Sequence, residues 1–181
     1  NNDEEVIASG NMRTADSPDV YRLNVRTGRT TLLTETRPSN VASWVLDRNF
    51  VPLVARVWIK DTQMFAIHYR KSESSPWEEI ARYDSTVGPA LVPLAFEADN
   101  KTLVVATNQG RDTMAVFKYD PEAKALGELL AQHPRYDMGA DALGSRVPGI
   151  VRHPATDDIV GYQVQGDKPE AVWTDPKFSR L

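Results

Sequence analysis

The chain has 181 residues, of which 41% are hydrophobic and 25% charged, so it can form one domain with a core of its own. The formal net charge is −4 with both signs interspersed, so there is no basic field for phosphates and we expect no nucleic acid partner. Cysteine is absent, which excludes disulfides, thiolate nucleophiles and sulfur-rich metal sites.

The composition does not indicate the cellular compartment of the protein. A chain without cysteine fits the bacterial cytoplasm and the periplasm equally well. Its apolar runs are far shorter than the ~20 residues that span a bilayer, so we expect no membrane span. The chain begins Asn1-Asn2-Asp3 with no signal-peptide pattern, and we expect it to be part of a longer protein.

Alternating hydrophobic and polar residues predict short strands along the whole chain, with helix as a minor component at most. Three strands are expected first, followed by a group of four, a second group of four, and three more. The expected ranges are 6–10, 20–25 and 31–34; 44–47, 51–60, 64–71 and 77–84; 91–96, 102–107, 114–120 and 126–132; and 149–152, 159–165 and 171–174. Clusters of Asp, Asn, Gly and Pro mark the turns between them.

The strand groups repeat. Residues 19–28 superpose on 115–124, an offset of 96 residues that contains one full group and gives about 48 residues per repeat. Repeats of this length with four strands each are typical of β-propeller blades. We therefore predict an all-β fold, a partial β-propeller of about three to four antiparallel four-stranded blades.

We expect this propeller to be a single domain over 1–181 that lacks part of the ring. Its blade-like units are expected at roughly 1–42, 43–88, 89–135 and 136–181. Blades at the two ends would have open strand edges, and such edges invite pairing with another copy of the chain. A homo-oligomer through these edges is accordingly one expected association.

Five segments in order carry a resemblance to a known family: DVYRLNVRTGR (19–29), SWVLDR (43–48), WEEI (77–80), HPRYD (133–137) and AVWTD (171–175). Together they resemble the propeller of bacterial prolyl-oligopeptidase-family serine peptidases, of the acylaminoacyl-peptidase and dipeptidyl-peptidase kind. The resemblance implies an N-terminal propeller that caps a C-terminal α/β-hydrolase domain of the same chain. It also implies that the propeller gates access, so that short peptide substrates reach the catalytic serine.

The catalytic part of such an enzyme is not in this sequence. An α/β-hydrolase carries its nucleophile in Gly-x-Ser-x-Gly, and the nearest serine, Ser145 in Leu143-Gly144-Ser145-Arg146-Val147, lacks both glycines at the required positions. We expect Ser145 to be a loop residue. The chain itself is predicted to be non-catalytic, with the hydrolase domain beyond Leu181 and no catalytic, cofactor-binding or metal-binding residue.

The histidine and aspartate residues do not form a recognisable metal-binding pattern. His68, His133 and His153 lack the short spacing that places two ligands on one face, and a structural or surface role is expected for all three. Asp157-Asp158 and the pair Asp137 and Asp141 could hold a cation, but acidic residues beside Gly, Pro and Thr are ordinary turn residues.

Glu78-Glu79 is the most suggestive pair, because dipeptidyl-peptidase relatives bind a substrate's amino terminus with two propeller glutamates. Neighbouring side chains of a strand point to opposite faces, however, and these two follow Pro76-Trp77 in an expected outer strand. We therefore expect Glu78 and Glu79 to lie in the solvent at the outer edge of a blade. Trp44, Trp58, Trp77 and Trp173 could stack on carbohydrate, but their alternating runs favour packing between blades.

Two other functions stay open for the whole chain. A stand-alone propeller could be a binding module or scaffold without hydrolase activity. A sialidase-type propeller is a more distant alternative, since Ser74-Ser75-Pro76-Trp77 only loosely resembles an Asp-box turn and no arginine triad is apparent. Asn100-Lys101-Thr102 fits the N-glycosylation pattern, which matters only in a secreted eukaryotic protein.

Overall fold

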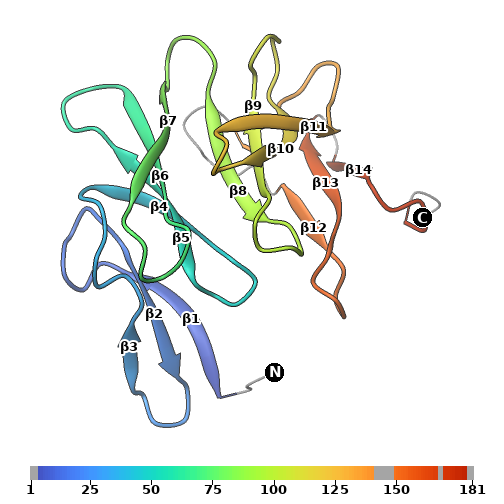
Figure 1. Cartoon of the computed structure of the whole chain (residues 1–181). Helices are drawn as coiled ribbons and strands as arrows, with labels where there is room; N and C mark the ends of the chain where they lie inside the picture. Colours follow the sequence, from blue (N-terminus) through green and yellow to red (C-terminus); the bar gives the residue numbers. More distant parts are fainter. Residues whose placement is uncertain (1–3, 141–148, 167–168, 179–181) are drawn as a thin grey trace.

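The computed structural model describes residues 4–140, 149–166 and 169–178, and these residues form strands and turns with no helix. Four antiparallel sheets follow one another along the chain, from the blue end to the red end of Figure 1. The first sheet contains β1 (Glu5–Gly10), β2 (Asp19–Asn24) and β3 (Thr30–Leu32). The second contains β4 (Val41–Leu46), β5 (Pro52–Trp58), β6 (Met64–Tyr69) and β7 (Glu78–Asp84).

The third sheet contains β8 (Leu91–Phe96), β9 (Leu103–Thr107), β10 (Ala115–Asp120) and β11 (Ala125–Ala131). The fourth contains β12 (Ile150–Arg152), β13 (Ile159–Gln165) and β14 (Pro169–Trp173). In every sheet the spatial order of the strands equals their order in the chain, so each sheet is a meander. The arrangement is an open β-propeller, which confirms the predicted fold class.

The core lies between neighbouring sheets, because strands with two buried faces are covered by a sheet on each side. One hydrophobic cluster joins Val20 of the first sheet to Trp44 and Val57 of the second. The largest cluster joins the second and third sheets, with the fully buried Ile67 and Leu103 among its members. A third joins the third and fourth sheets. Each sheet is thus stabilised mainly by its neighbours.

The connections place two kinds of loop at opposite ends of the sheets. Segments 33–40 and 85–90 lead from the last strand of one sheet to the first strand of the next, and we call the end where they lie the linker face. The turns 47–51, 97–102 and 153–158 close the hairpin between the first two strands of a sheet, at the opposite end, which we call the turn face. The first strands β4 and β8 contact each other, so these hairpins lie on the inner side.

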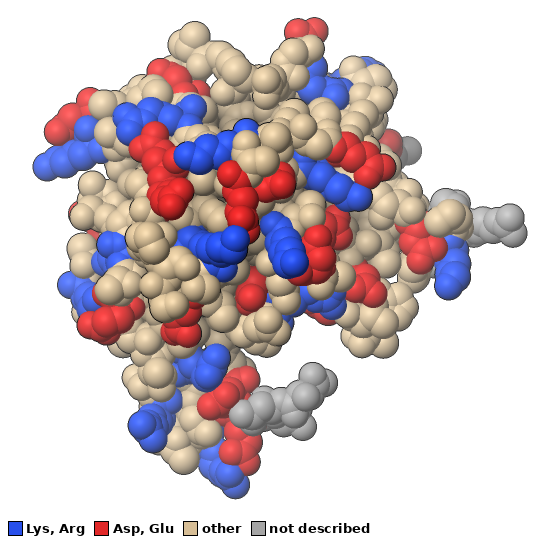
Figure 2. Space-filling model, in the orientation of Figure 1, with Lys and Arg blue, Asp and Glu red and all other residues tan. Residues whose placement is uncertain are grey.

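The surface carries charge of both signs. Figure 2 shows lysine and arginine side chains lying among aspartate and glutamate over the visible face, with no extended patch of one sign. Within the part of the chain that the structure describes, no helix has the length and hydropathy needed to cross a membrane.

Candidate functional site

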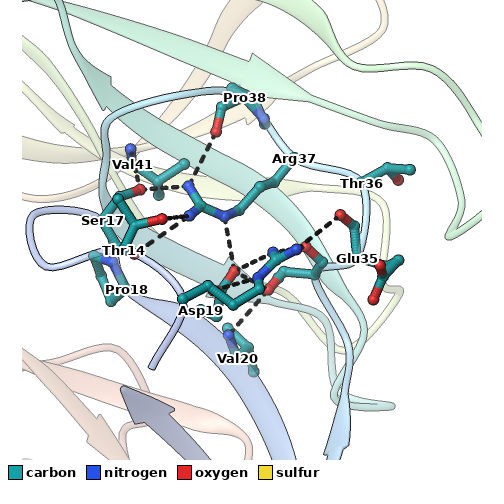
Figure 3. A network of polar contacts seen from close by, with 12 residues as sticks. Thr14, Ser17, Pro18, Asp19, Val20, Glu35, Thr36, Arg37, Pro38 and Val41 are labelled. Atoms are coloured by element: carbon teal, nitrogen blue, oxygen red, sulfur yellow. Dashed lines mark hydrogen bonds and ion pairs between the residues drawn. The ribbon is translucent and has the colours of Figure 1, made fainter. Parts of the chain in front are cut away.

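The most developed polar site surrounds Asp19, the first residue of β2, whose side chain is 0% exposed. Arg13, from the loop between β1 and β2, donates from Nε to Asp19 Oδ2 at 2.8 Å and from Nη2 to Oδ1 at 2.7 Å. Arg37, from the segment between β3 and β4, places Nε 2.7 Å from Oδ1. One buried carboxylate therefore holds two arginines from two different loops of the linker face (Figure 3).

Neutral groups complete this network. We call the five residues Arg13, Ser17, Asp19, Thr34 and Arg37 the Asp19 clamp. The Thr34 hydroxyl donates to Asp19 Oδ1 at 2.8 Å and accepts from the Val20 amide at 3.2 Å. Ser17 Oγ accepts from Arg37 Nη1 at 2.5 Å and from the Val41 amide, the first residue of the second sheet, at 2.9 Å. The clamp thereby fixes the first sheet to the start of the second.

The charges in the clamp stabilise one another. The hydrogen bond from the Arg13 guanidinium, helped by Thr34 and Arg37, holds the pKa of Asp19 below its usual value although burial acts in the opposite direction. The same carboxylate raises the pKa of Arg13. Asp19 is therefore ionised at neutral pH, and its charge is compensated inside the protein.

A polar pocket of about 450 Å³ lies beside the clamp and is lined by Arg13, Thr14, Ser17, Glu35, Arg37, Pro38, Ser39 and Asn40. Arg37 has little left to offer a ligand, because its guanidinium nitrogens already contact Asp19, Thr14, Ser17 and the Pro38 carbonyl. Arg13 also donates to the carbonyl oxygens of Thr34 and Glu35. The arrangement is suited to holding two sheets together rather than to binding an anion.

The glutamate pair Glu78 and Glu79 lies in β7, the outer strand of the second sheet, and both residues are exposed. Arg82 donates to the two carboxylate oxygens of Glu79 at 2.9 and 2.7 Å, and these hydrogen bonds lower the pKa of Glu79. Glu78 instead lines a shallow pocket with Tyr69, Lys71, Ser75, Pro76, Pro121 and Glu122. The structure does not bring the two carboxylates together around one site.

The three histidines lie apart from one another and serve turns and packing. His68 is in β6, and partial burial lowers its pKa. His133 Nδ1 accepts from the amides of Arg135 and Tyr136 at 3.2 and 3.1 Å. His153 Nδ1 accepts from the amides of Ala155 and Thr156, both at 3.2 Å. The two His-Pro segments therefore form turns that are capped by the imidazole.

The acidic residues considered for a cation have protein partners. Asp157 is paired with Arg152 at 3.2 Å and Asp158 with Arg48 at 2.7 Å. Asp137 accepts from the Met114 amide at 2.8 Å. Asp141 and Ser145 lie outside the described residues. Among residues 4–140, 149–166 and 169–178, no group of three or more His, Asp or Glu residues is arranged to hold a metal ion.

The tryptophans pack to different degrees. Trp44 is buried between the first two sheets and donates from Nε1 to the Pro18 carbonyl at 2.7 Å. Trp58 and Trp77 are partly buried against the hydrophobic clusters, and the Arg70 guanidinium lies 4.6 Å from the Trp77 ring centroid. Trp173 stacks on Phe178. The ring centroids of Trp44 and Trp77 are 5.7 Å apart, but Trp44 is buried, so this pair does not offer two exposed rings to a carbohydrate.

Sequence reasoning missed the Asp19 clamp. Its available signal was an aspartate at the first position of a buried strand, with a serine and a proline just before it. The two arginine partners lie 6 and 18 residues from Asp19 in loops, and nothing in the local pattern pairs them with this carboxylate.

The fold and the Asp19 clamp are those of an open β-propeller whose sheets are joined by polar side chains. No family model matches the chain. It is 24% identical over 171 residues to dipeptidyl aminopeptidase BIII of Pseudoxanthomonas mexicana, a match that covers 94% of this chain and 23% of the relative. The chain thus spans about a quarter of the length of that peptidase.

The chain also matches two solved structures at low sequence identity. TolB from Acinetobacter baumannii has a TM-score of 0.50 and 13% identity, covering 94% of this chain and 41% of TolB. The β-propeller domain of the Trilobed protease from Pyrococcus furiosus has a TM-score of 0.48 and 9% identity, covering 92% and 52%. The similarity to a dipeptidyl aminopeptidase over nearly the whole chain confirms the predicted resemblance to a peptidase propeller.

Proposed function

We propose that this chain is the propeller part of a serine peptidase of the prolyl-oligopeptidase family, and that it limits access of peptides to a hydrolase domain of the same protein. The observation that carries the proposal is the 171-residue similarity to a dipeptidyl aminopeptidase whose remaining length lies outside the match. The sequence supports it as well, because no Gly-x-Ser-x-Gly nucleophile motif occurs in the chain.

The construction of the sheets suits an access barrier. The Asp19 clamp fixes the first sheet to the second at the linker face, and Arg48 joins the second sheet to the fourth at the turn face. A barrier that excludes large substrates must keep its blades at fixed angles, and such cross-links between sheets resist their separation. Four of the carboxylates considered above are paired with arginines of this chain, namely Asp19, Glu79, Asp157 and Asp158. The proposal assigns the catalytic chemistry to the hydrolase domain.

The test uses the complete product of the reading frame that contains this chain. We expect it to hydrolyse chromogenic dipeptides, and a serine-to-alanine change in its Gly-x-Ser-x-Gly motif to abolish hydrolysis. Loosening the first sheet with Asp19→Asn should then increase cleavage of unfolded casein relative to the dipeptide, because a less rigid barrier admits longer chains. Glu122→Gln, which removes an exposed ion pair with Lys71, serves as the control.

A reading frame that closes the propeller without a hydrolase domain would refute the proposal and favour a stand-alone binding propeller. An active peptidase whose ratio of casein to dipeptide cleavage is the same for wild type and Asp19→Asn would retain the peptidase assignment. The same result would refute the proposal that the propeller limits access of peptides.

A further inference from the structure

The pocket that Glu78 lines has a volume of about 290 Å³ and lies between the second and third sheets. One wall comes from the second sheet, namely the end of β6, the loop 70–77 and the start of β7. The other wall is the turn between β10 and β11 of the third sheet. The lining residues are Tyr69, Lys71, Ser75, Pro76, Glu78, Pro121 and Glu122.

Two polar side chains of the second sheet lie side by side in this pocket. Tyr69 of β6 and Glu78 of β7 are directly opposite in the antiparallel register, so both side chains lie on the same face of the sheet. Tyr69 is only 8% exposed, yet its hydroxyl keeps contact with solvent and has no hydrogen-bond partner among the described residues. The hydroxyl therefore points into the pocket. Glu78 is exposed, and within the described part of the chain its carboxylate makes no ion pair.

The other charged groups of the pocket compensate each other. Lys71 Nζ donates to Glu122 Oε2 at 2.7 Å, which leaves Glu78 as the charge available to a ligand. Burial, together with the Glu122 carboxylate, raises the pKa of Tyr69, so its hydroxyl stays protonated at neutral pH. Two carboxylates and one ammonium group give the lining a net charge of −1. The pocket thus disfavours anions and favours a cation.

Both walls of the pocket are fixed by internal hydrogen bonds. The buried Arg70 donates from Nε to the Pro52 carbonyl and from Nη1 to the Glu73 carbonyl, both at 2.8 Å, which holds the loop 70–77. Asp120 Oδ1 accepts from two backbone amides of the opposite turn, both at 2.9 Å. A ligand would consequently meet groups that are already in position, which lowers the entropic cost of binding.

The free carboxylate and hydroxyl suit a planar cation with several N–H donors. A guanidinium group binds a carboxylate through two parallel hydrogen bonds, as Arg82 binds the neighbouring Glu79 at 2.9 and 2.7 Å. Its remaining N–H groups can donate to the Tyr69 hydroxyl, and a short alkyl chain can pack on the two proline rings of the lining. We propose that this pocket binds an alkylguanidinium group through Glu78 and Tyr69. The inference does not depend on the proposed peptidase function.

The test titrates n-propylguanidinium into the 181-residue chain and follows the amide chemical shifts of residues 69–78 by NMR. We expect saturable shifts with a Kd on the order of 1 mM, about fivefold weaker binding for Glu78→Gln and about threefold weaker binding for Tyr69→Phe. Glu79→Gln is the matched control, because Glu79 is opposite His68 in the register and lies on the other face of the sheet. It should leave binding unchanged. Glu78→Gln should leave the urea midpoint unchanged, which separates binding from stability.

Three further ligands define the chemistry of the pocket. N-Propylurea, the neutral planar analogue, should give no saturable shifts over the same concentration range. Equal binding of N-propylurea, tighter binding of n-butylammonium, equal weakening by Glu78→Gln and Glu79→Gln, or no shifts for the wild type would each overturn the proposal. Nα-Acetyl-arginine N-methylamide distinguishes the sources of the group and supports the proposal whenever it binds. Tighter binding than n-propylguanidinium would indicate an arginine of a partner protein, and equal or weaker binding a free guanidine compound.

Discussion

Replacing Asp19 by asparagine tests whether the clamp is a structural element of the fold. The carboxylate is 0% exposed and is shared by Arg13, which is 37% exposed, and Arg37, which is only 11% exposed. When the Asp19 charge is lost, water can hydrate the exposed guanidinium of Arg13, but it reaches the guanidinium of Arg37 poorly. Removing one partner of a buried ion pair costs about 3 to 5 kcal/mol, and we expect the lower end, about 3 kcal/mol.

Urea unfolding measures this effect directly. With an m-value of about 2 kcal/mol/M, a loss of about 3 kcal/mol lowers the urea midpoint by roughly 1.5 M. Glu122→Gln, which breaks an exposed pair, should leave the midpoint unchanged. A loss below about 1 kcal/mol for Asp19→Asn would show that the two arginines find other partners, and the reasoning on the clamp would fail.

Two further predictions concern the pH dependence of the Asp19 clamp and the packing around Gly139. Since the folded pKa of Asp19 is lowered, its stabilisation is present above the unfolded value of about 3.9 and is lost as the pH falls through the folded pKa; the stability difference between wild type and Asp19→Asn should therefore shrink between pH 5 and pH 2. Gly139→Ala should cost about 1 to 3 kcal/mol in urea, because Gly139 has φ +80° and a Cβ there would lie 2.8 Å from Leu94 Cδ1. Gly110→Ala, with φ +71° and no atom within 4 Å, should cost less; equal losses would refute the steric explanation.

The strands were predictable because each one carries its own signal. Short apolar runs mark strands such as β5, β6 and β9, which are buried on both faces, and turn residues separate the strands, so their order and approximate bounds could be inferred from local patterns. The repeat was visible because β2 and β10, which superpose in sequence, are each followed by the last strand of their sheet. Local periodicity therefore specifies this fold well.

The polar contacts were not predictable for a related reason. Arg48 and Asp158 are separated by 110 residues, and their pairing depends on the angles between three sheets. Arg37 reaches Asp19 only because the segment between β3 and β4 folds back over the start of β2. Side chains in irregular loops have no periodicity, so a sequence pattern cannot pair them before the fold is known.

Because each hydrophobic cluster is shared by two consecutive sheets, the molecule is stable in the manner of a one-dimensional array. Loss of a terminal sheet removes one interface and leaves the others complete, whereas damage to the large cluster between the second and third sheets weakens both halves. Amide hydrogen exchange should thus be slowest in β6 and β9 and fastest in β1 and β14. Duplication or deletion of a whole sheet is therefore less disruptive to the fold than an insertion or deletion inside a sheet.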